Sequence, residues 1–256
     1  MTDVRTHLEQ PLAERILVLD GSWGVLIHRR GFSEEEYRGE RYSSHPRDVK
    51  GDPDLFNLTQ PDVVAEIHDA YFGAGADIAT TNTFTATRIG QADYGLEGAA
   101  AEMSLEGARL ARRAADEWTT RTPEQPRFVA GSVGPLNVTL SLSPRVEDAA
   151  YRGVTFDEVR GAYEEQIAAL RDGGVDLLLI ETIFDTLNAK AAVVAARDVA
   201  PELPLWLSFT AVDKSGRNLS GQTSDAFWIS VEHAEPFIVG VNCSLGATEM
   251  RPFLER

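Results

Sequence analysis

The sequence is poor in several features on which whole classes of protein depend. Among its 256 residues it has one cysteine, Cys243, which excludes a disulfide framework within the chain. No run of eighteen or more apolar residues occurs, so no membrane-spanning helix is expected. The first sixteen residues also lack the apolar core of a secretory signal. Together these absences predict a protein of the reducing cytoplasm.

Basic residues are scarce as well. Lys and Arg number 24 against 40 Asp and Glu, which gives a formal net charge of -16. Such a surface repels nucleic acid phosphates and anionic membranes, so a small molecule is the expected partner. None of the three lysines follows an apolar run, which disfavours Schiff-base chemistry. The five histidines form no metal-binding pattern, and no G-x-G-x-x-G motif indicates a dinucleotide site.

Short apolar runs that alternate with helical segments dominate the rest of the chain. Six runs predict strands, at residues 16–19, 77–81, 128–132, 176–181, 205–209 and 237–242. The helices are expected from Pro61 to about residue 73, at 96–118, 156–170, 187–199 and 224–235, and from about residue 248. Residues 28–60 are predicted to be a long irregular loop.

Most of these runs are continuously apolar, as in parallel strands that are buried on both faces. The pattern therefore predicts an α/β fold, either a barrel or a doubly wound sheet. An internal echo favours the barrel: residues 74–77 and 173–176 have the same small-Gly-x-Asp form, and each precedes a strand. Residues 1–15 are predicted to be a polar lead-in and residues 16–256 the barrel.

Polar residues end most of the predicted strands and would meet at the mouth of a barrel. The candidate residues are Asp20, Gly21, Ser22, Thr81, Asn82, Thr83, Ser132, Asn137, Glu181, Asn242 and Cys243. Each has a plain structural alternative. Asp20 could hold a turn, Glu181 could form an ion pair, and Cys243 could be a small buried hydrophobic residue. A partly buried Glu181 nonetheless needs a partner, and a bound ammonium group is a good one.

These strand ends resemble those of the homocysteine S-methyltransferase family, and within it the N-terminal barrels of cobalamin-dependent methionine synthases. The resemblance runs in order from about residue 15 to the end. The matching stretches are residues 17–24, 38–41, 74–77, 81–84, 129–135, 180–191, 219–223 and 240–246. It implies a (β/α)₈ barrel of the TIM type, present here as about six β/α units, with the last two strands missing.

The resemblance also implies a mechanism. Three cysteine thiolates would bind zinc, with Cys243 as the first, and the homocysteine thiolate would fill the open position. Metal binding stabilises a thiolate, which then attacks the methyl group of methylcobalamin to give methionine. Asp20 and Glu181 would hold the substrate ammonium group, and Thr81 with the Gly21–Ser22 backbone its carboxylate. Folate and cobalamin would bind other modules of the full-length enzyme.

One part of the family pattern is absent, namely the Gly-Gly-Cys-Cys-Gly-Thr motif with the other two cysteines. We therefore expect this chain alone to bind zinc weakly, to lack methyl transfer and to self-associate through its open barrel edges. Two alternatives remain. One is a related methyltransferase that uses betaine or S-methylmethionine, and the other is an inactive amino-acid-binding fragment.

Overall fold

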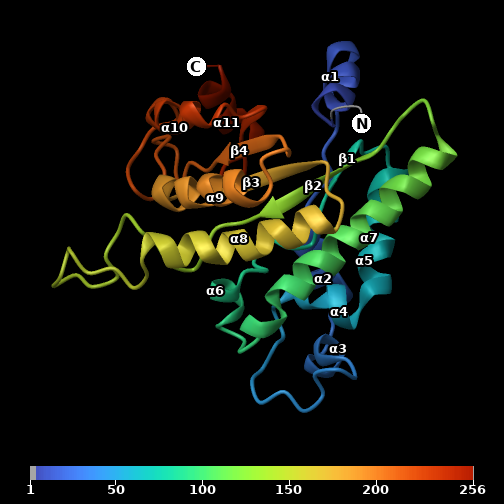
Figure 1. Cartoon of the computed structure of the whole chain (residues 1–256), viewed down its shortest axis with the longest axis horizontal. Coiled ribbons are helices and arrows are strands. Elements are labelled where there is room, and N and C mark those ends of the chain that lie inside the picture. Colours follow the sequence, from blue (N-terminus) through green and yellow to red (C-terminus); the bar gives the residue numbers. More distant parts are fainter. Residues whose placement is uncertain (1–3, 256) are drawn as a thin grey trace.

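The computed structural model describes residues 4–255 and shows one parallel sheet flanked by helices (Figure 1). The strands lie side by side in chain order: β1 (Ile78–Thr80), β2 (Phe128–Val133), β3 (Leu177–Ile183), β4 (Leu205–Phe209) and β5 (Ile238–Val241). Sequential parallel strands with intervening helices are the pattern of a (β/α) barrel. The α/β prediction is confirmed, with five assigned strands in place of six.

The longer helices have nearly the bounds that the sequence predicts. They are α5 (Pro61–Gly73), α7 (Ala100–Arg121), α8 (Phe156–Asp172), α9 (Thr186–Val199), α10 (Ser224–Val231) and α11 (Ala247–Leu254). The remaining short ones are α6 (Arg88–Gln91) and the 3₁₀ turns η2 (Glu97–Ala99) and η3 (Glu232–Ala234). The last predicted helix before residue 248 is therefore shorter than expected, because its final turn is 3₁₀.

The sheet buries both of its faces, as the apolar runs predict. Val129 and Leu178 pack toward the helices in the main core, together with Ile180. Their neighbours along the strands, Phe128 and Leu177, face the barrel interior in a separate cluster. This alternation follows from the two-residue period of a strand.

The first predicted strand is only partly realised, and its predicted burial is wrong. Leu19 forms a single parallel bridge to Ile78, and the Val18 carbonyl accepts the N–H groups of Asp77 and Ile78. Ile16 is 87% exposed and Val18 is 53% exposed. Leu19 packs into the interior, but no described helix covers the opposite face of this segment. The chain therefore has the direction of a strand without its full pairing or burial.

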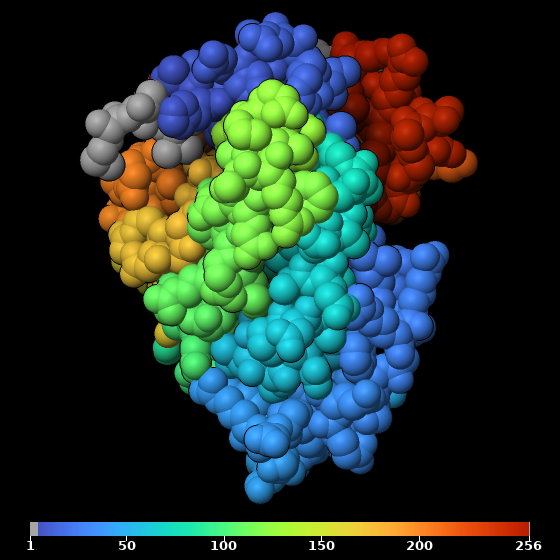
Figure 2. Space-filling view, turned by 90° about the vertical axis from the view of Figure 1, so that its right-hand side faces the viewer, coloured from blue at the N-terminus to red at the C-terminus, as the bar shows by residue number. Residues whose placement is uncertain are grey.

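The polar lead-in forms a helix, α1 (Val4–Glu14), that closes one end of the barrel. Leu8 is fully buried against the interior cluster that contains Phe128 and Leu177. The Arg5 guanidinium lies 5.2 Å from the ring centroid of Phe237, next to β5. Figure 2 shows α1 across the top of the molecule, above α7 and α5. This helix lies at the amino ends of the strands and so away from the predicted site.

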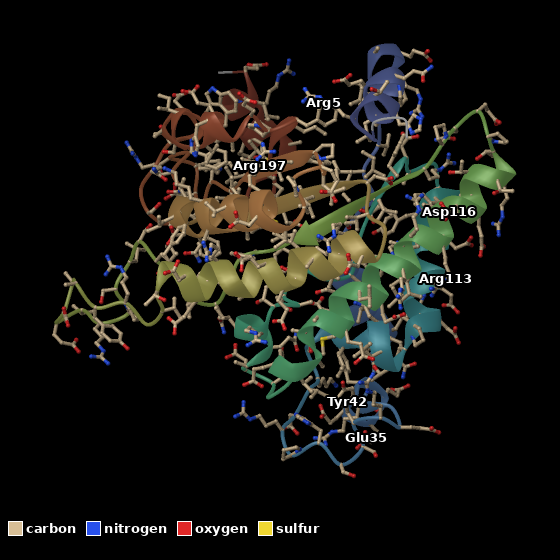
Figure 3. The ribbon with its side chains drawn as sticks, in the orientation of Figure 1. Arg5, Glu35, Tyr42, Arg113, Asp116 and Arg197 are labelled. Carbon is tan, nitrogen blue, oxygen red and sulfur yellow. The ribbon has the colours of Figure 1, made fainter. Side chains whose placement is uncertain are left out.

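The segment predicted to be an irregular loop contains much helix. It contains α3 (Glu34–Arg38), η1 (Pro53–Leu55) and α4 (Phe56–Thr59), and the end of α2 (Trp23–Arg30) reaches into it. A capping box of Ser33 and Glu36 starts α3. Figure 3 shows Glu35 and Tyr42 at the far end of the molecule from Arg5.

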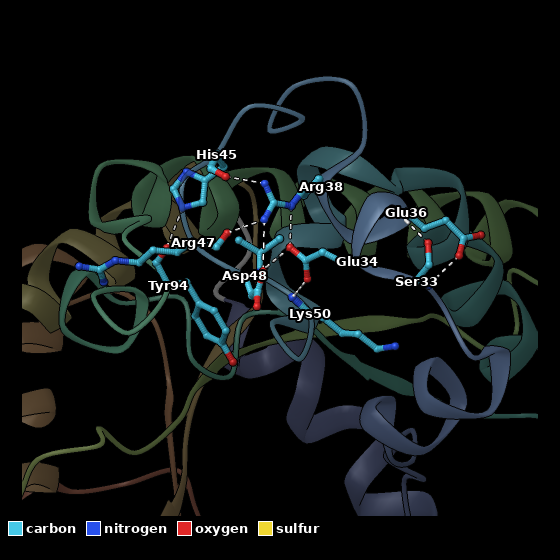
Figure 4. A network of polar contacts seen from close by, with 10 residues as sticks. Ser33, Glu34, Glu36, Arg38, His45, Arg47, Asp48, Lys50 and Tyr94 are labelled. Atoms are coloured by element: carbon cyan, nitrogen blue, oxygen red, sulfur yellow. Dashed lines mark hydrogen bonds and ion pairs between the residues drawn. The ribbon is translucent and has the colours of Figure 1, made fainter.

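A polar network holds this segment in shape (Figure 4). The Arg38 guanidinium contacts Glu34 at 2.6 Å and donates to the carbonyls of His45 and Arg47. Glu34 also accepts the N–H groups of Val49 and Lys50 at 2.9 and 2.7 Å. The network fixes the course of residues 39–50 and so sets where the following η1 turn lies.

The repeated small-Gly-x-Asp sequence corresponds to two equivalent sets of aspartate contacts between neighbouring segments of the sheet. We call each set a clasp. Asp77 binds the backbone of Val18 through both its own N–H and its carboxylate, each at 2.8 Å, and pairs with Arg15. Asp176 binds the backbone of Val129 in the same way, at 2.8 and 2.7 Å, and pairs with Arg112. Each clasp fixes the register of a strand at its amino end.

The sheet has two open edges, at residues 16–19 and at β5. Apolar side chains are exposed along them, including Ile16, Val18 and Val239. Such edges favour pairing with another strand, so self-association stays a prediction for light scattering. Within residues 4–255 no helix combines the length and apolar character needed to cross a membrane.

Candidate active site

A cavity of about 570 Å³ opens at the carboxyl ends of the strands. It brings together residues from five different strand ends, as the barrel prediction requires. Of the predicted site residues, those that line it are Asp20, Gly21, Ser22, Thr81, Asn82, Glu181, Asn242 and Cys243. Residues that are far apart in the sequence therefore share one concave site.

The ionisable side chains that line this cavity include carboxyl groups but no basic groups. Asp20 and Glu181 line it, with Asp54 at its wall, and no Lys, Arg or His is among its lining residues. Neither Asp20 nor Glu181 forms an ion pair with any residue between 4 and 255. Partly buried carboxylates without a cationic partner favour the binding of a cation.

Asp20 is held rigidly by one residue of β1. The Thr80 N–H donates to Asp20 Oδ2 at 2.9 Å, and the Thr80 hydroxyl donates to Oδ1 at 3.0 Å. Burial raises the pKa of Asp20 to about 7, although the hydrogen bonds from Thr80 and Trp23 act in the opposite direction. The charge of Glu181 adds to the increase. At neutral pH this carboxyl group is therefore close to its titration midpoint.

Glu181 is oriented by a polar cluster at the ends of β2 to β5. The Ser132 hydroxyl donates to Glu181 Oε1 at 2.7 Å, and the Asn242 amide lies 3.3 Å from Oε2. Asn242 Oδ1 in turn accepts from Ser208 and from the N–H of Thr182. Burial raises the pKa of Glu181 above its usual value, and hydrogen bonds from Ser132 and Thr182 oppose the increase only in part.

Cys243 lies at the cavity with its side chain exposed. Its sulfur is 3.3 Å from Asn242 Nδ2 and 3.7 Å from the Thr182 hydroxyl. Three residues here have left-handed backbone conformations: Thr182 (φ 56°), Cys243 (φ 61°) and Ser244 (φ 65°). Such strain at non-glycine residues is concentrated at functional sites. The thiol thus faces the same space as the two carboxylates.

The residues present do not complete a zinc site. A catalytic zinc site needs three protein ligands, and the cavity offers one thiol. Among the described residues no group of three His, Cys, Asp or Glu side chains could hold a metal ion. We therefore assign no chemical step to zinc in this chain.

The threonines after β1 differ from their predicted roles. The Thr83 hydroxyl donates to the Ser132 carbonyl at 2.7 Å and does not line the cavity. The Thr83 hydroxyl has one hydrogen, which this bond uses. In the 2.6 Å bond between the Thr81 and Thr83 hydroxyls, Thr81 must therefore be the donor. Thr81 then has no hydrogen left for a substrate carboxylate. Asn137, a weaker candidate, pairs with Asp93 outside the cavity.

Among the lining residues that had no role assigned from the sequence, three bear on the charge and hydrogen bonding of the site. Thr80 lies inside a predicted strand, and Trp23 lies at the start of α2, in a stretch for which no helix was predicted. Asp54 reaches the cavity from η1, where the sequence offers no periodic signal. The Asp20-Gly21-Ser22-Trp23 stretch was the only hint to Trp23, because its partner lies 57 residues further along the chain.

Comparisons with known proteins agree with this geometry. A family model described as homocysteine S-methyltransferase matches residues 17–256. The metallated form of the homocysteine methyltransferase MmuM from Escherichia coli superposes with a TM-score of 0.71 at 24% identity, covering 92% of this chain and 77% of that one. Its oxidized form gives a TM-score of 0.70 at 24% identity, with coverages of 91% and 75%. These structures share the fold.

Proposed function

The chain belongs to the homocysteine S-methyltransferase family, and from this membership we propose that its cavity binds homocysteine through the ammonium group and directs the thiol toward Cys243. Homocysteine methyltransferase activity is the activity of the family. The observation that supports this binding mode is the pair of partly buried carboxylates, Asp20 and Glu181, in a cavity without a basic side chain. An ammonium group satisfies both.

The substrate carboxylate needs donors, and we assign them to the start of α2. Ser22 makes no side-chain cap bond there, so the first N–H groups of this helix have no side-chain partner from the N-cap. Gly21, Ser22, Trp23 and Gly24 line the cavity at this point. A helix N-terminus favours an anion through these N–H groups and through its dipole. Thr81 is not part of this proposal.

The methyl donor that we propose is methylcobalamin, supplied by a cobalamin module, with folate bound elsewhere in a longer enzyme. The support is the resemblance of residues 38–41 and 184–190 to methionine synthases. Because this chain alone is expected to lack methyl transfer, the choice is tested on a longer enzyme that contains it, in an assay with methylcobalamin, S-methylmethionine and betaine supplied separately. Transfer from either of the latter two alone would overturn it.

Calorimetry with L-homocysteine is the direct test of the binding mode. We expect binding of L-homocysteine and of L-methionine, which share the ammonium and carboxylate groups, and no binding of a homocysteine analogue without the amino group. If the analogue bound as well as homocysteine, the role of the two carboxylates would be wrong.

Homocysteine affinity is expected to depend on pH. Burial raises the pKa of Asp20 to about 7, and only the ionised carboxylate attracts an ammonium group. The affinity should therefore increase about tenfold between about pH 6 and pH 8, because the ionised fraction increases by that factor. Titrations at matched ionic strength measure this, and Asp20→Asn should flatten the profile. A flat wild-type profile would contradict the prediction.

Zinc content provides a separate prediction. With one thiol at the cavity, we expect the purified 256-residue chain to retain much less than one zinc per chain after dialysis. Metal analysis of the wild type and of Cys243→Ser should give similar low values. One tightly held zinc per chain, lost in the Cys243→Ser variant, would show that other ligands complete the site.

A further inference from the structure

Asp20 belongs to a chain of hydrogen bonds that continues along the cavity wall. The indole Nε1 of Trp23 lies 3.2 Å from the Thr80 hydroxyl oxygen, which in turn lies 3.0 Å from Asp20 Oδ1. An indole N–H can only donate, so the Thr80 oxygen is the acceptor in the first bond. The single hydroxyl hydrogen of Thr80 is then free to point at Asp20. The direction of the whole chain is therefore fixed.

The other end of this chain is held in place by α5. The Trp23 ring meets the His68 ring edge-on, with centroids 4.6 Å apart and an interplanar angle of 72°. His68 is fully buried, and neither of its ring nitrogens has a hydrogen-bond partner among the described residues. One helical turn later, the Tyr71 hydroxyl donates to the Ser22 carbonyl at 3.2 Å. Both contacts fix the Asp20–Trp23 turn from behind.

We propose that Thr80 and Trp23 are positioning residues for homocysteine binding, because they hold the Asp20 carboxyl group in one orientation, aimed into the cavity. This inference rests on the proposed function, since it concerns the same ammonium group. Thr80 binds both oxygens of Asp20, which fixes the plane of the carboxylate. The outer lone pairs are left for the ligand. His68 acts one step further away, by holding the Trp23 ring.

Several other titratable groups surround Asp20 and are common to all the variants below. Glu181 of β3 and Tyr71 of α5 interact with it electrostatically, and Asp54 of η1 and Cys243 after β5 line the same cavity. The hydrogen bonds from Thr80 and Trp23 lower the pKa of Asp20, against the increase caused by burial. Removing them should therefore shift the pH profile of binding upward while the other groups stay the same.

The test compares Thr80→Val, which removes the hydroxyl at nearly constant shape, with Thr80→Ser, which keeps it. L-homocysteine is titrated into the whole chain by calorimetry across the pH range. We expect Thr80→Val to bind about tenfold more weakly at neutral pH and to shift the pH midpoint upward by about one unit. Trp23→Phe should shift the midpoint in the same direction by less, and Thr80→Ser should match the wild type.

Thr122→Val is the matched control, because it removes a hydroxyl bonded to the Trp118 carbonyl at the end of α7, outside the cavity. It should leave both affinity and midpoint unchanged. The inference is overturned if Thr80→Val keeps the wild-type midpoint, or if Thr80→Ser loses as much affinity as Thr80→Val. A wild-type chain that does not bind homocysteine would instead refute the proposed function.

Discussion

Replacing Glu181 with glutamine is expected to weaken homocysteine binding about 100-fold, or about 3 kcal/mol. Glutamine preserves the shape of the side chain and can still accept the Ser132 hydroxyl through its amide oxygen. It removes the negative charge that would pair with the ligand ammonium group. Asp20 alone then balances that charge in a cavity without a basic residue. Calorimetry with L-homocysteine measures the change.

The same substitution should not harm the fold, which separates loss of binding from loss of structure. Burial raises the pKa of Glu181, so the folded chain is less stable with this group ionised than with it neutral. The melting temperature of Glu181→Gln should therefore equal or exceed that of the wild type. Glu165→Gln is the control, since Glu165 forms an exposed pair with Arg88 on the outer helices. Glu181→Gln binding within about threefold of wild type would contradict the prediction.

Replacing Asp77 with asparagine is expected to lower the free energy of unfolding by about 3 kcal/mol. The Asp77 carboxylate is fully buried and accepts from Arg15 at 2.6 and 2.7 Å, from the Val18 N–H at 2.8 Å and from Gln125 at 2.7 Å. Asparagine has one acceptor oxygen and an NH₂ group, which would face these donors. Denaturant unfolding measures the loss.

The pH dependence of stability checks the same clasp. Burial alone would raise the pKa of Asp77, but the hydrogen bonds from Arg15, Gln125 and the Val18 backbone outweigh it and lower the pKa to about 2. A depressed pKa stabilises the fold above the unfolded value of about 4, and this contribution is lost as the pH falls toward 2. The Asp77→Asn variant should therefore lose less of its free energy of unfolding than the wild type as the pH falls from about 4 toward 2.

A matched surface pair gives the contrast. Glu102 and Arg41 make two hydrogen bonds of 2.7 Å, yet both side chains are nearly half exposed. Glu102→Gln should therefore change the free energy of unfolding by less than about 1 kcal/mol. Equal losses in the Asp77 and Glu102 variants would show that burial of the clasp is not what gives it strength.

The sequence predicted the strands and helices wherever one pattern was strong. Residues 176–181 form an apolar run that packs on both faces, and β3 has the expected place in the sheet. The run at 16–19 looks similar, but a strand with one neighbour and no covering helix leaves Ile16 and Val18 exposed. Composition alone cannot reveal whether another element covers a face.

The segment at 28–60 was misjudged for a different reason. Its helices are short and lack a long apolar period, so they were predicted as loop. The capping signature of Ser33 and Glu36 was nonetheless readable from their spacing. The α1 helix was hidden by its polar character, since Leu8 is the one fully buried side chain between residues 5 and 14.

The site was predictable where chemistry sits at strand ends. Asp20, Glu181 and Cys243 meet at one cavity because parallel strands end at the same face of the sheet. The roles of Thr80 and Trp23 could not be predicted, because each depends on contacts between residues about sixty positions apart. The sequence also could not show that the Thr81 hydroxyl donates to Thr83, because this follows from the contacts of Thr81, Thr83 and Ser132 together.

The left-handed backbone at Thr182, Cys243 and Ser244 has a consequence for anyone who engineers this chain. Each such conformation costs on the order of 1 kcal/mol or more in a residue with a side chain, whereas glycine adopts it freely. Screening random libraries for heat resistance would therefore enrich glycine at these positions, Cys243 included. A more stable protein obtained in this way would have lost the Cys243 thiol at the cavity. Any such screen therefore needs a selection for ligand binding beside the selection for heat resistance.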